Sequence, residues 1–226
     1  MNNNPAIEAK GVNHFYAKVY GIFALGLGIS AISAYLAMTM FFEQTISFID
    51  SFPLGLTGIW LAEIILVVLL SAKAQKNPSL TIAGFVVYSL LNGLVLSVTL
   101  SMYTQALVGK AFATATATFL AMALYGAMTK RDLSGMGRAA IGLLIGVIVA
   151  TLINFFLQSP AVDYLLSYLT VAIFLGLTAY DNQQIRNLYF ATAGQDNTGF
   201  AAFMALQLYL DFINLFLSFL RIFSRN

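Results

Sequence analysis

The sequence predicts an all-α membrane protein with several transmembrane helices. Hydrophobic residues make up 60% of its 226 residues and charged residues only 9%, against about 25% charged residues in soluble domains. Apolar runs of about 20 residues, the length that a helix needs to cross a bilayer, recur along the whole chain. No long linker or low-complexity tract separates these runs, so we expect a single integral membrane domain over residues 1–226.

Seven apolar stretches are candidates for transmembrane helices. Residues 1–15 are expected to be a polar tail, residues 41–53 a loop and residues 182–199 a polar segment. The first stretch is too long for the core of a signal peptide, so we expect it to remain as the first span. The predicted spans cover residues 18–40, 54–72, 80–103, 111–129, 139–157, 162–180 and 200–222.

Two of these stretches contain small residues in a regular pattern. Thr and Ala alternate at Thr114, Thr116 and Thr118, which locally resembles the periodicity of a strand. In an apolar stretch of this length, such residues favour close packing between helices instead. Gly142 and Gly146, four residues apart, are expected to form a second packing face, either within the bundle or between subunits.

The last stretch, residues 200–222, indicates how the others are arranged. Its polar side chains follow one another at steps of three or four residues and therefore lie on one face of a helix. A carboxylate at the bilayer centre costs at least about 2.5 kcal/mol. We therefore expect this helix to lie inside a bundle, with the polar stripe turned to a partner. The stripe consists of Gln207, Asp211, Asn214, Ser218, Arg221 and Arg225.

The positions of Lys and Arg predict that the N-terminus lies in the cytoplasm. In that orientation the outer loops hold only Lys110, and the most basic loop, residues 130–138, lies inside. The side of the C-terminus stays open. If the last helix crosses the membrane, Arg221 and Arg225 lie outside, against the rule, and if it re-enters they lie inside.

Three acidic residues within or at the ends of the spans are the functional candidates: Glu63, Asp181 and Asp211. Ionisable groups are costly to keep in a membrane and often mark ion pathways. The alternative is that they only hold helices together through salt bridges, as Glu63 would if it paired with Arg221. Lys73 is a candidate counter-charge for the aspartates, but it could equally extend to the lipid headgroups.

Contact between Asp181 and Asp211 would create a link between the last two helices that depends on pH. Two carboxylates in a low-dielectric site cannot both ionise cheaply, so they would share a proton. Once both are ionised, they would repel each other or bind a cation, and calcium prefers oxygen ligands of this kind. The pattern predicts a cation path with these two residues as gate, pH sensor and transient calcium site.

An enzymatic function is not expected. Intramembrane aspartyl proteases also use two aspartates, one of them preceded by Tyr, as Asp181 is here. Their second aspartate follows a Gly-x-Gly pattern, whereas Leu208, Tyr209 and Leu210 precede Asp211. The motifs of zinc proteases, serine hydrolases and P-loop proteins are absent, and the chain has no cysteine. We expect no cofactor, with calcium only as a transported ion.

Two motifs near the C-terminus resemble those of the Bax inhibitor-1 family, in particular its bacterial inner-membrane branch. They are Gly176-Leu-Thr-Ala-Tyr-Asp-Asn-Gln-Gln-Ile185 and Leu208-Tyr-Leu-Asp-Phe-Ile-Asn-Leu-Phe216, followed by Leu220-Arg-Ile-Phe223. Residues 129–135 and 88–94 are also similar to that family, and the resemblance runs from about residue 15 to the end.

This resemblance implies seven helices, with the last surrounded by the other six, in a bacterial inner membrane. It implies a pH-sensitive calcium leak controlled by an aspartate pair that falls on Asp181 and Asp211. A supporting ion pair of the family falls on Glu63 and Arg221. One bacterial member has an arginine at the inner end of its second helix, where this chain has Lys73, which cannot make the forked contact of an arginine.

The resemblance also implies an alternative function. Some bacterial relatives bind and restrain the membrane-anchored protease FtsH, so this chain could be a regulatory binding protein. Engagement of the protease would need an accessible cytoplasmic tail, and residues 1–15 offer only a short one. A leak needs the carboxylate pair and the lipid bilayer alone, so the sequence favours the leak.

Overall fold

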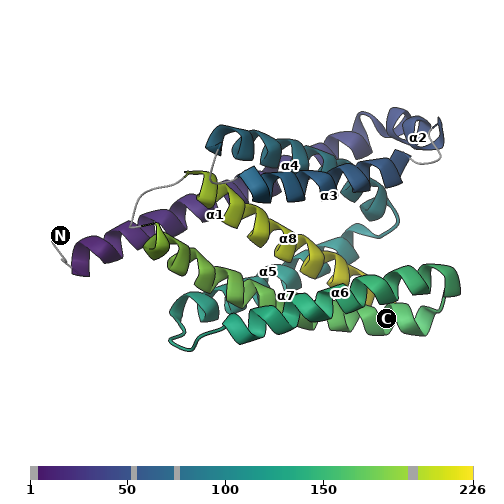
Figure 1. Ribbon diagram of the computed structural model, residues 1–226. Helices are drawn as coiled ribbons and strands as arrows, with labels where there is room; N and C mark the ends of the chain where they lie inside the picture. The colour runs from purple at the N-terminus through teal and green to yellow at the C-terminus, as the bar shows by residue number, and fades with distance from the viewer. Residues whose placement is uncertain (1–4, 52–54, 74–76, 193–197, 226) are drawn as a thin grey trace. The chain divides into compact units, whose positions relative to one another are not determined.

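A computed structural model describes residues 5–51, 55–73, 77–192 and 198–225 (Figure 1). Every regular element within these ranges is an α-helix, and no strand occurs among them, which confirms the predicted all-α class. The helices are α1 (Pro5–Thr39), α2 (Phe42–Ser51), α3 (Gly55–Lys73), α4 (Pro78–Ser101), α5 (Gln105–Met128), α6 (Ser134–Leu157), α7 (Pro160–Ala191) and α8 (Thr198–Phe223).

Six of the described helices are long and apolar enough to cross a membrane: α1, α4, α5, α6, α7 and α8. The polytopic architecture is therefore confirmed. The predicted span 54–72 falls on α3, whose described apolar part, Ala62–Ala72, is shorter than a bilayer crossing needs. The seventh crossing stays a prediction.

Three segments that were expected to lie outside the spans are helical in large part. α1 begins at Pro5, α2 lies in the expected loop 41–53, and α7 continues beyond the predicted end of its span at residue 180 to Ala191. The end of α7 contains neither Gly nor Pro after Asp181, and Ile185 anchors it because its side chain is fully buried. The length of an apolar run thus indicates the membrane crossing and not the length of the helix.

The Thr and Ala alternation belongs to the helix α5, as predicted. The hydroxyl groups of Thr114, Thr116 and Thr118 each donate to the carbonyl group four residues earlier in the same helix. This bonding satisfies the hydroxyl groups without a partner helix, so these threonines are compatible with a surface that faces lipid.

The chain divides into two compact units. Unit 1 comprises Met1–Thr104 and Ala191–Leu206, and unit 2 comprises Gln105–Phe190 and Gln207–Asn226. α8 therefore begins in unit 1 and continues into unit 2. The single integral domain stays a prediction.

In unit 1, α1 packs along α4, and α3 packs on α4. Ser30 of α1 donates a hydrogen bond of 2.7 Å to the carbonyl oxygen of Ser89. Gly93 allows this close approach, since a Cβ atom there would collide with the main chain at Ser30. The start of α8 is held on α1 by a hydrogen bond of 2.7 Å from the Lys18 Nζ to the Thr198 hydroxyl group.

In unit 2, side-chain amides close both helix connections. The Gln183 Oε1 of α7 accepts from the Leu133 N–H (2.9 Å), and its Nε2 donates to the Arg131 carbonyl oxygen (2.8 Å). Asn154, near the end of α6, makes the same pair of bonds with the N–H and the carbonyl group of Ser159. The connection from α5 to α6 is thereby attached to α7, two residues beyond Asp181.

The expected packing face at Gly142 and Gly146 is open. A Cβ atom placed on either glycine would meet no atom of the chain within 4 Å. Packing of this face within the chain is therefore not seen among the described residues, and packing between subunits stays a prediction. The glycine of α6 that does pack is Gly137, one turn after the helix begins, against the ring of Tyr180.

Candidate functional site

Asp181 lies within α7 and is only 8% exposed. Its neighbours Thr178, Ala179 and Asn182 are completely buried. The Thr178 hydroxyl group donates to the Phe174 carbonyl oxygen, and the Asn182 side chain donates to the Thr178 carbonyl oxygen, both over 2.7 Å. These polar neighbours are therefore satisfied within their own helix, and Asp181 is the one acidic residue of this turn.

Two glycines fix the position of α7 beside Asp181. A Cβ atom on Gly126 of α5 would collide with the main chain at Ala179, and one on Gly137 of α6 would collide with the ring of Tyr180. Two neighbouring helices thus approach α7 immediately before Asp181, as closely as the missing side chains permit. Such contacts are typical of helix packing in membranes.

Asp211 lies near the middle of α8 and is 3% exposed. Its carboxyl group interacts electrostatically with that of Asp181 and lies close to the Thr178 hydroxyl group. Its Oδ2 atom is buried and has no hydrogen-bond partner within the described part of the chain. The structure thus brings the two predicted aspartates together, in an arrangement with an unsatisfied buried carboxyl oxygen.

Aromatic rings of α5 cover the helix turn that carries Asp211. The ring of Phe212 packs edge-on against Phe112 and Phe119, with centroids 5.6 Å apart in both pairs. Phe216, one turn later, packs against Phe112 at 6.1 Å. An apolar lining of this kind lowers the local dielectric and strengthens the interaction between the carboxyl groups.

The other predicted site residues lie elsewhere. Glu63 of α3 is 5% exposed; its side chain bonds to Asn92 of α4, and its buried Oε1 has no partner among the described residues. Arg221 is exposed at the end of α8. Glu63 belongs to unit 1 and Arg221 to unit 2, so their ion pair stays a prediction. The Lys73 side chain lies outside the described residues.

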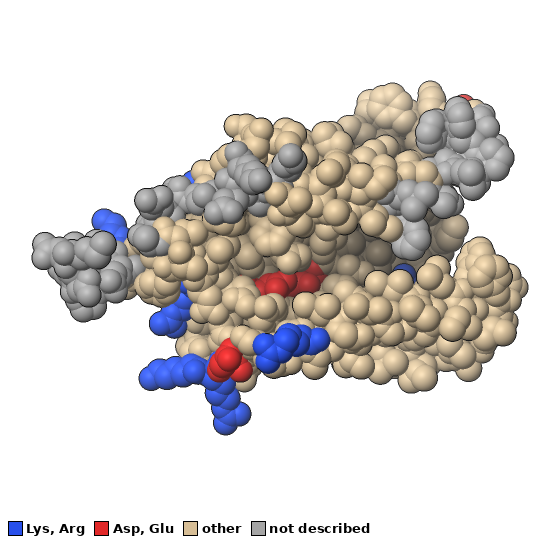
Figure 2. All heavy atoms as spheres, in the orientation of Figure 1, with Lys and Arg blue, Asp and Glu red and all other residues tan. Residues whose placement is uncertain are grey.

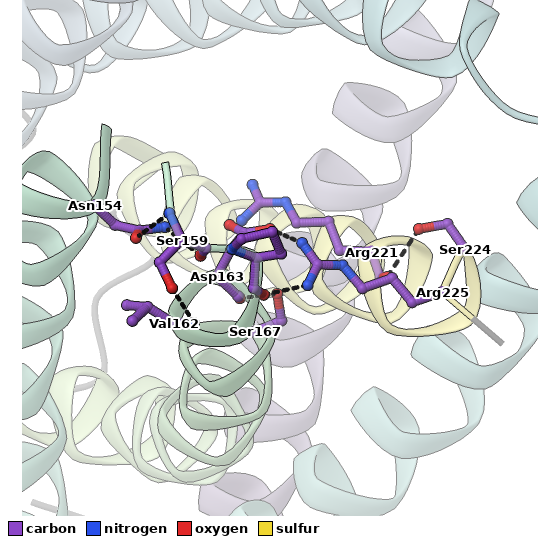
Figure 3. Close-up of polar contacts among 9 residues, drawn as sticks. Asn154, Ser159, Val162, Asp163, Ser167, Arg221, Ser224 and Arg225 are labelled. Atoms are coloured by element: carbon purple, nitrogen blue, oxygen red, sulfur yellow. Dashed lines mark hydrogen bonds and ion pairs between the residues drawn. The ribbon is translucent and has the colours of Figure 1, made fainter. Parts of the chain in front are cut away.

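The structure contains an ion pair that sequence reasoning missed (Figure 3). Arg225, after the end of α8, donates to the Asp163 carboxylate over 2.5 Å and to the Pro160 carbonyl oxygen, both at the start of α7. Its guanidinium group also lies over the ring of Tyr164. The available signal was an acidic residue at the start of one span and a basic residue at the end of the next, since consecutive spans are commonly antiparallel.

This ion pair shows where α8 ends. α8 is continuous from Thr198 to Phe223, and its end meets the start of α7. Asp163 and Asp181 are 18 residues apart, and Asp211 and Arg225 are 14 residues apart. At 1.5 Å per residue these separations are about 27 Å and about 21 Å, and an arginine side chain can span the difference. One antiparallel register therefore accounts for both pairs.

The site could bind a metal ion only weakly. Among the described residues, no three His, Asp or Glu side chains are close enough to hold an ion together. Two carboxylates supply at most about four oxygen ligands, fewer than the six to eight that calcium takes. Water would have to provide the remaining ligands.

Comparison with known proteins finds bacterial membrane proteins that are similar to nearly the whole chain. A family model described as inhibitor of apoptosis-promoting Bax1 matches residues 12–226. An uncharacterized membrane protein of Streptococcus pyogenes serotype M1 is 46% identical over 216 residues, covering 96% of this chain and 94% of the relative. The inner membrane protein YbhL of Escherichia coli K12 is 40% identical over 220 residues, covering 96% of this chain and 93% of YbhL.

Proposed function

This chain belongs to the Bax inhibitor-1 family, and from that premise we propose that it is a pH-sensitive leak for calcium and similar cations, gated by Asp181 and Asp211. The observation that carries the proposal is the buried carboxyl pair on α7 and α8, in which Asp211 retains an oxygen with no partner among the described residues. A buried pair of ionisable groups costs too much free energy for a role in helix packing alone.

The proposed gate works through the shared proton. With one carboxyl group protonated, the pair forms a hydrogen bond and holds α8 against α7. With both ionised, the two charges repel each other in an apolar surrounding, and a cation with its water can enter between them. Since Gly126 and Gly137 fix α7 at this level, we propose that α8 is the helix that moves.

Flux measurements with the full-length protein test this proposal. Calcium entry into liposomes is measured from about pH 5 to 8, because loss of the shared proton is the proposed gating event. The parent is compared with Asp181→Asn and Asp211→Asn. Asp132→Asn is the matched control, because it makes the same chemical change at an exposed position of unit 2.

We expect a pH-dependent flux in the parent, an unchanged flux in Asp132→Asn, and a flux without pH dependence in both site variants. A flux that keeps its pH dependence in Asp211→Asn would refute the gate. No flux above empty liposomes at any pH would refute the leak and favour regulation of the protease FtsH. The segment on which that alternative depends, residues 1–15, is helical from Pro5 onward.

Lys73 and the Glu63–Arg221 pair enter the proposal in supporting roles. Lys73→Gln in the same assay asks whether the lysine is a counter-charge: a changed pH profile would support this role, and an unchanged profile would exclude it. Glu63→Gln and Arg221→Gln, singly and together, ask whether the two residues pair. A double variant no worse than either single variant would support the pair.

A further inference from the structure

Four exposed basic side chains gather at the end of unit 2 where α5 is connected to α6. Figure 2 shows basic side chains grouped around one acidic side chain at the lower left, where Figure 1 places this connection. They come from the connection itself, from the first turns of α6 and from the extended end of α7. We call Lys130, Arg131, Arg138 and Arg186 the basic platform.

The backbone beneath the platform is held in place. Gln183 binds both the Arg131 carbonyl group and the Leu133 N–H, and the Leu133 side chain is buried. Arg186 lies three residues after Gln183 and therefore on the same face of α7, one turn further on. The amide bonds thus bring Arg186 to the side of Arg131 without any attraction between the two cations.

A single acid accompanies the four cations. Asp132 is the one acidic residue in the segments 129–138 and 183–190. Its carboxylate accepts a hydrogen bond of 2.9 Å from the Ser134 N–H at the start of α6. The hydrogen bonds from Ser134, together with the charge of Arg138, lower the pKa of Asp132. Asp132 therefore stays ionised and bound to the helix, and the platform keeps an excess of positive charge.

Apolar side chains border the platform. Met128, the last residue of α5, is 76% exposed, and Phe190, near the end of α7, is 48% exposed. The Arg186 guanidinium group lies over the ring of Phe190, 6.0 Å from its centroid. The platform thus lies where the apolar surfaces of two membrane helices end, which is the level of lipid headgroups.

The opposite end of unit 2 is different. There Arg225 is paired with Asp163, Lys110 lies over the ring of Phe223, 4.4 Å from its centroid, and Arg221 is the one other basic residue. The platform is therefore a cluster with unbalanced charge beside an apolar rim. A soluble phosphate would leave the rim unused, whereas a phospholipid would cover it with its acyl chains.

We propose that the basic platform is a binding site for the headgroup of an anionic phospholipid. The phosphate lies between Arg131, Arg138 and Arg186, and the chains follow the exposed surfaces of Met128 and Phe190. The site does not depend on the aspartate pair or on any flux.

Lipid titrations of the full-length protein in neutral detergent test the site. Phosphatidylglycerol or phosphatidylcholine is added, and bound lipid is counted by native mass spectrometry. The variants are Arg131→Gln, Arg138→Gln and Arg186→Gln, with Lys110→Gln as the matched control at the opposite end of unit 2. Glycerol phosphate is added as a competitor that lacks acyl chains.

We expect phosphatidylglycerol to be retained in preference to phosphatidylcholine, and each arginine variant to bind it about fivefold more weakly, since a basic residue near a membrane contributes about 1 kcal/mol. Lys110→Gln is expected to bind like the parent. Equal retention of the two lipids, equal loss in Lys110→Gln, or full displacement by glycerol phosphate would each overturn the proposal.

A further variant distinguishes a built site from general attraction. Gln183→Leu keeps all four basic residues but removes both bonds to the connection. We expect it to bind phosphatidylglycerol more weakly than the parent at the same salt concentration. Unchanged binding by correctly folded Gln183→Leu would mean that charge alone attracts the lipid, and a defined site would be excluded.

Discussion

α6 and α8 are apolar helices of similar length, yet they have opposite surroundings. α6 has the highest mean hydropathy of the six candidate spans, and only 11% of its 18-residue apolar stretch is buried. α8 is less apolar, and 67% of its corresponding 18-residue stretch is buried. In a soluble protein the more hydrophobic helix would be expected in the core.

The difference shows what decides burial in a membrane. Lipid chains are as apolar as leucine side chains, so an apolar face gains little by turning inward. α8 carries Asp211 and Ser218, which are buried, whereas Asn154 is the single Asn, Asp or Glu residue of α6 and lies at its end. The polar stripe, and not hydrophobicity, thus places a helix inside.

The largest expected effect comes from giving α6 the charge that α8 carries. Ile145 lies in the middle of α6 and is 59% exposed. Ile145→Asp should disfavour membrane insertion by about 2.5–3.5 kcal/mol, the cost of an aspartate at the centre of a span. The yield of folded protein in membranes measures this effect, with Ile145→Leu as control. A normal yield would mean that this face of α6 is not in contact with lipid.

The next largest effect is expected from replacing glycines, because a substitution on a packed face should destabilise the protein and one on an open face should not. Gly126→Ala forces a Cβ atom against the main chain at Ala179, and such overpacking destabilises by about 1–3 kcal/mol. Gly142→Ala enters open space and should be neutral or stabilise the helix by up to about 1 kcal/mol. Thermal unfolding in detergent measures both. Equal destabilisation would indicate that Gly142 is packed.

The ion pair at the end of α8 should contribute less. Asp163 and Arg225 are both partly exposed, and such pairs contribute about 0–1 kcal/mol. Arg225→Gln should therefore lower the unfolding temperature slightly, and less so in high salt. A double-mutant cycle with Asp163→Asn isolates the pair; additive losses would show that the two side chains do not interact in solution.

The smallest expected effect is that of Asp132, whose carboxylate accepts a hydrogen bond from the Ser134 N–H at the start of α6. Hydrogen bonds from Ser134 lower its pKa below the usual value of about 3.9. Because the pKa is lower in the folded protein, the stabilisation is complete above about pH 4 and disappears as the pH falls through the folded-state pKa. Asp132→Ala should thus be slightly less stable than the parent at pH 7 and equally stable in strong acid, as thermal unfolding at both pH values would show.

Much of this arrangement follows from local patterns in the sequence. The steps of three and four residues from Gln207 to Ser218 predict a helix with one polar face, and the structure places Asp211 of that face beside Asp181. Local patterns succeed here because a charged side chain in lipid costs so much free energy that the polar face of the helix must turn inward. The same reasoning identified Glu63 as buried, although its proposed partner stays a prediction.

Other features could not be found in this way. Arg225 and Asp163 are 62 residues apart, and Gln183 is an ordinary polar residue until α7 is known to continue past Asp181. Gly142 and Gly146 match a packing pattern but face open space, while Gly126, which has no such partner in sequence, packs most closely. The spacing of residues in the sequence shows which of them share a face of one helix. Which face contacts another helix depends on how the neighbouring helices are rotated and placed.

The two amides that close the connections of unit 2 have a further consequence. Gln183 and Asn154 hold the backbone with neutral groups, which gain and lose no proton as a cell acidifies or recovers. The buried carboxyl groups of Asp181 and Asp211, in contrast, can take up and release a proton. In the proposed gate, a change in pH would therefore act on the two carboxyl groups between α7 and α8, while the connections that Gln183 and Asn154 hold keep their shape.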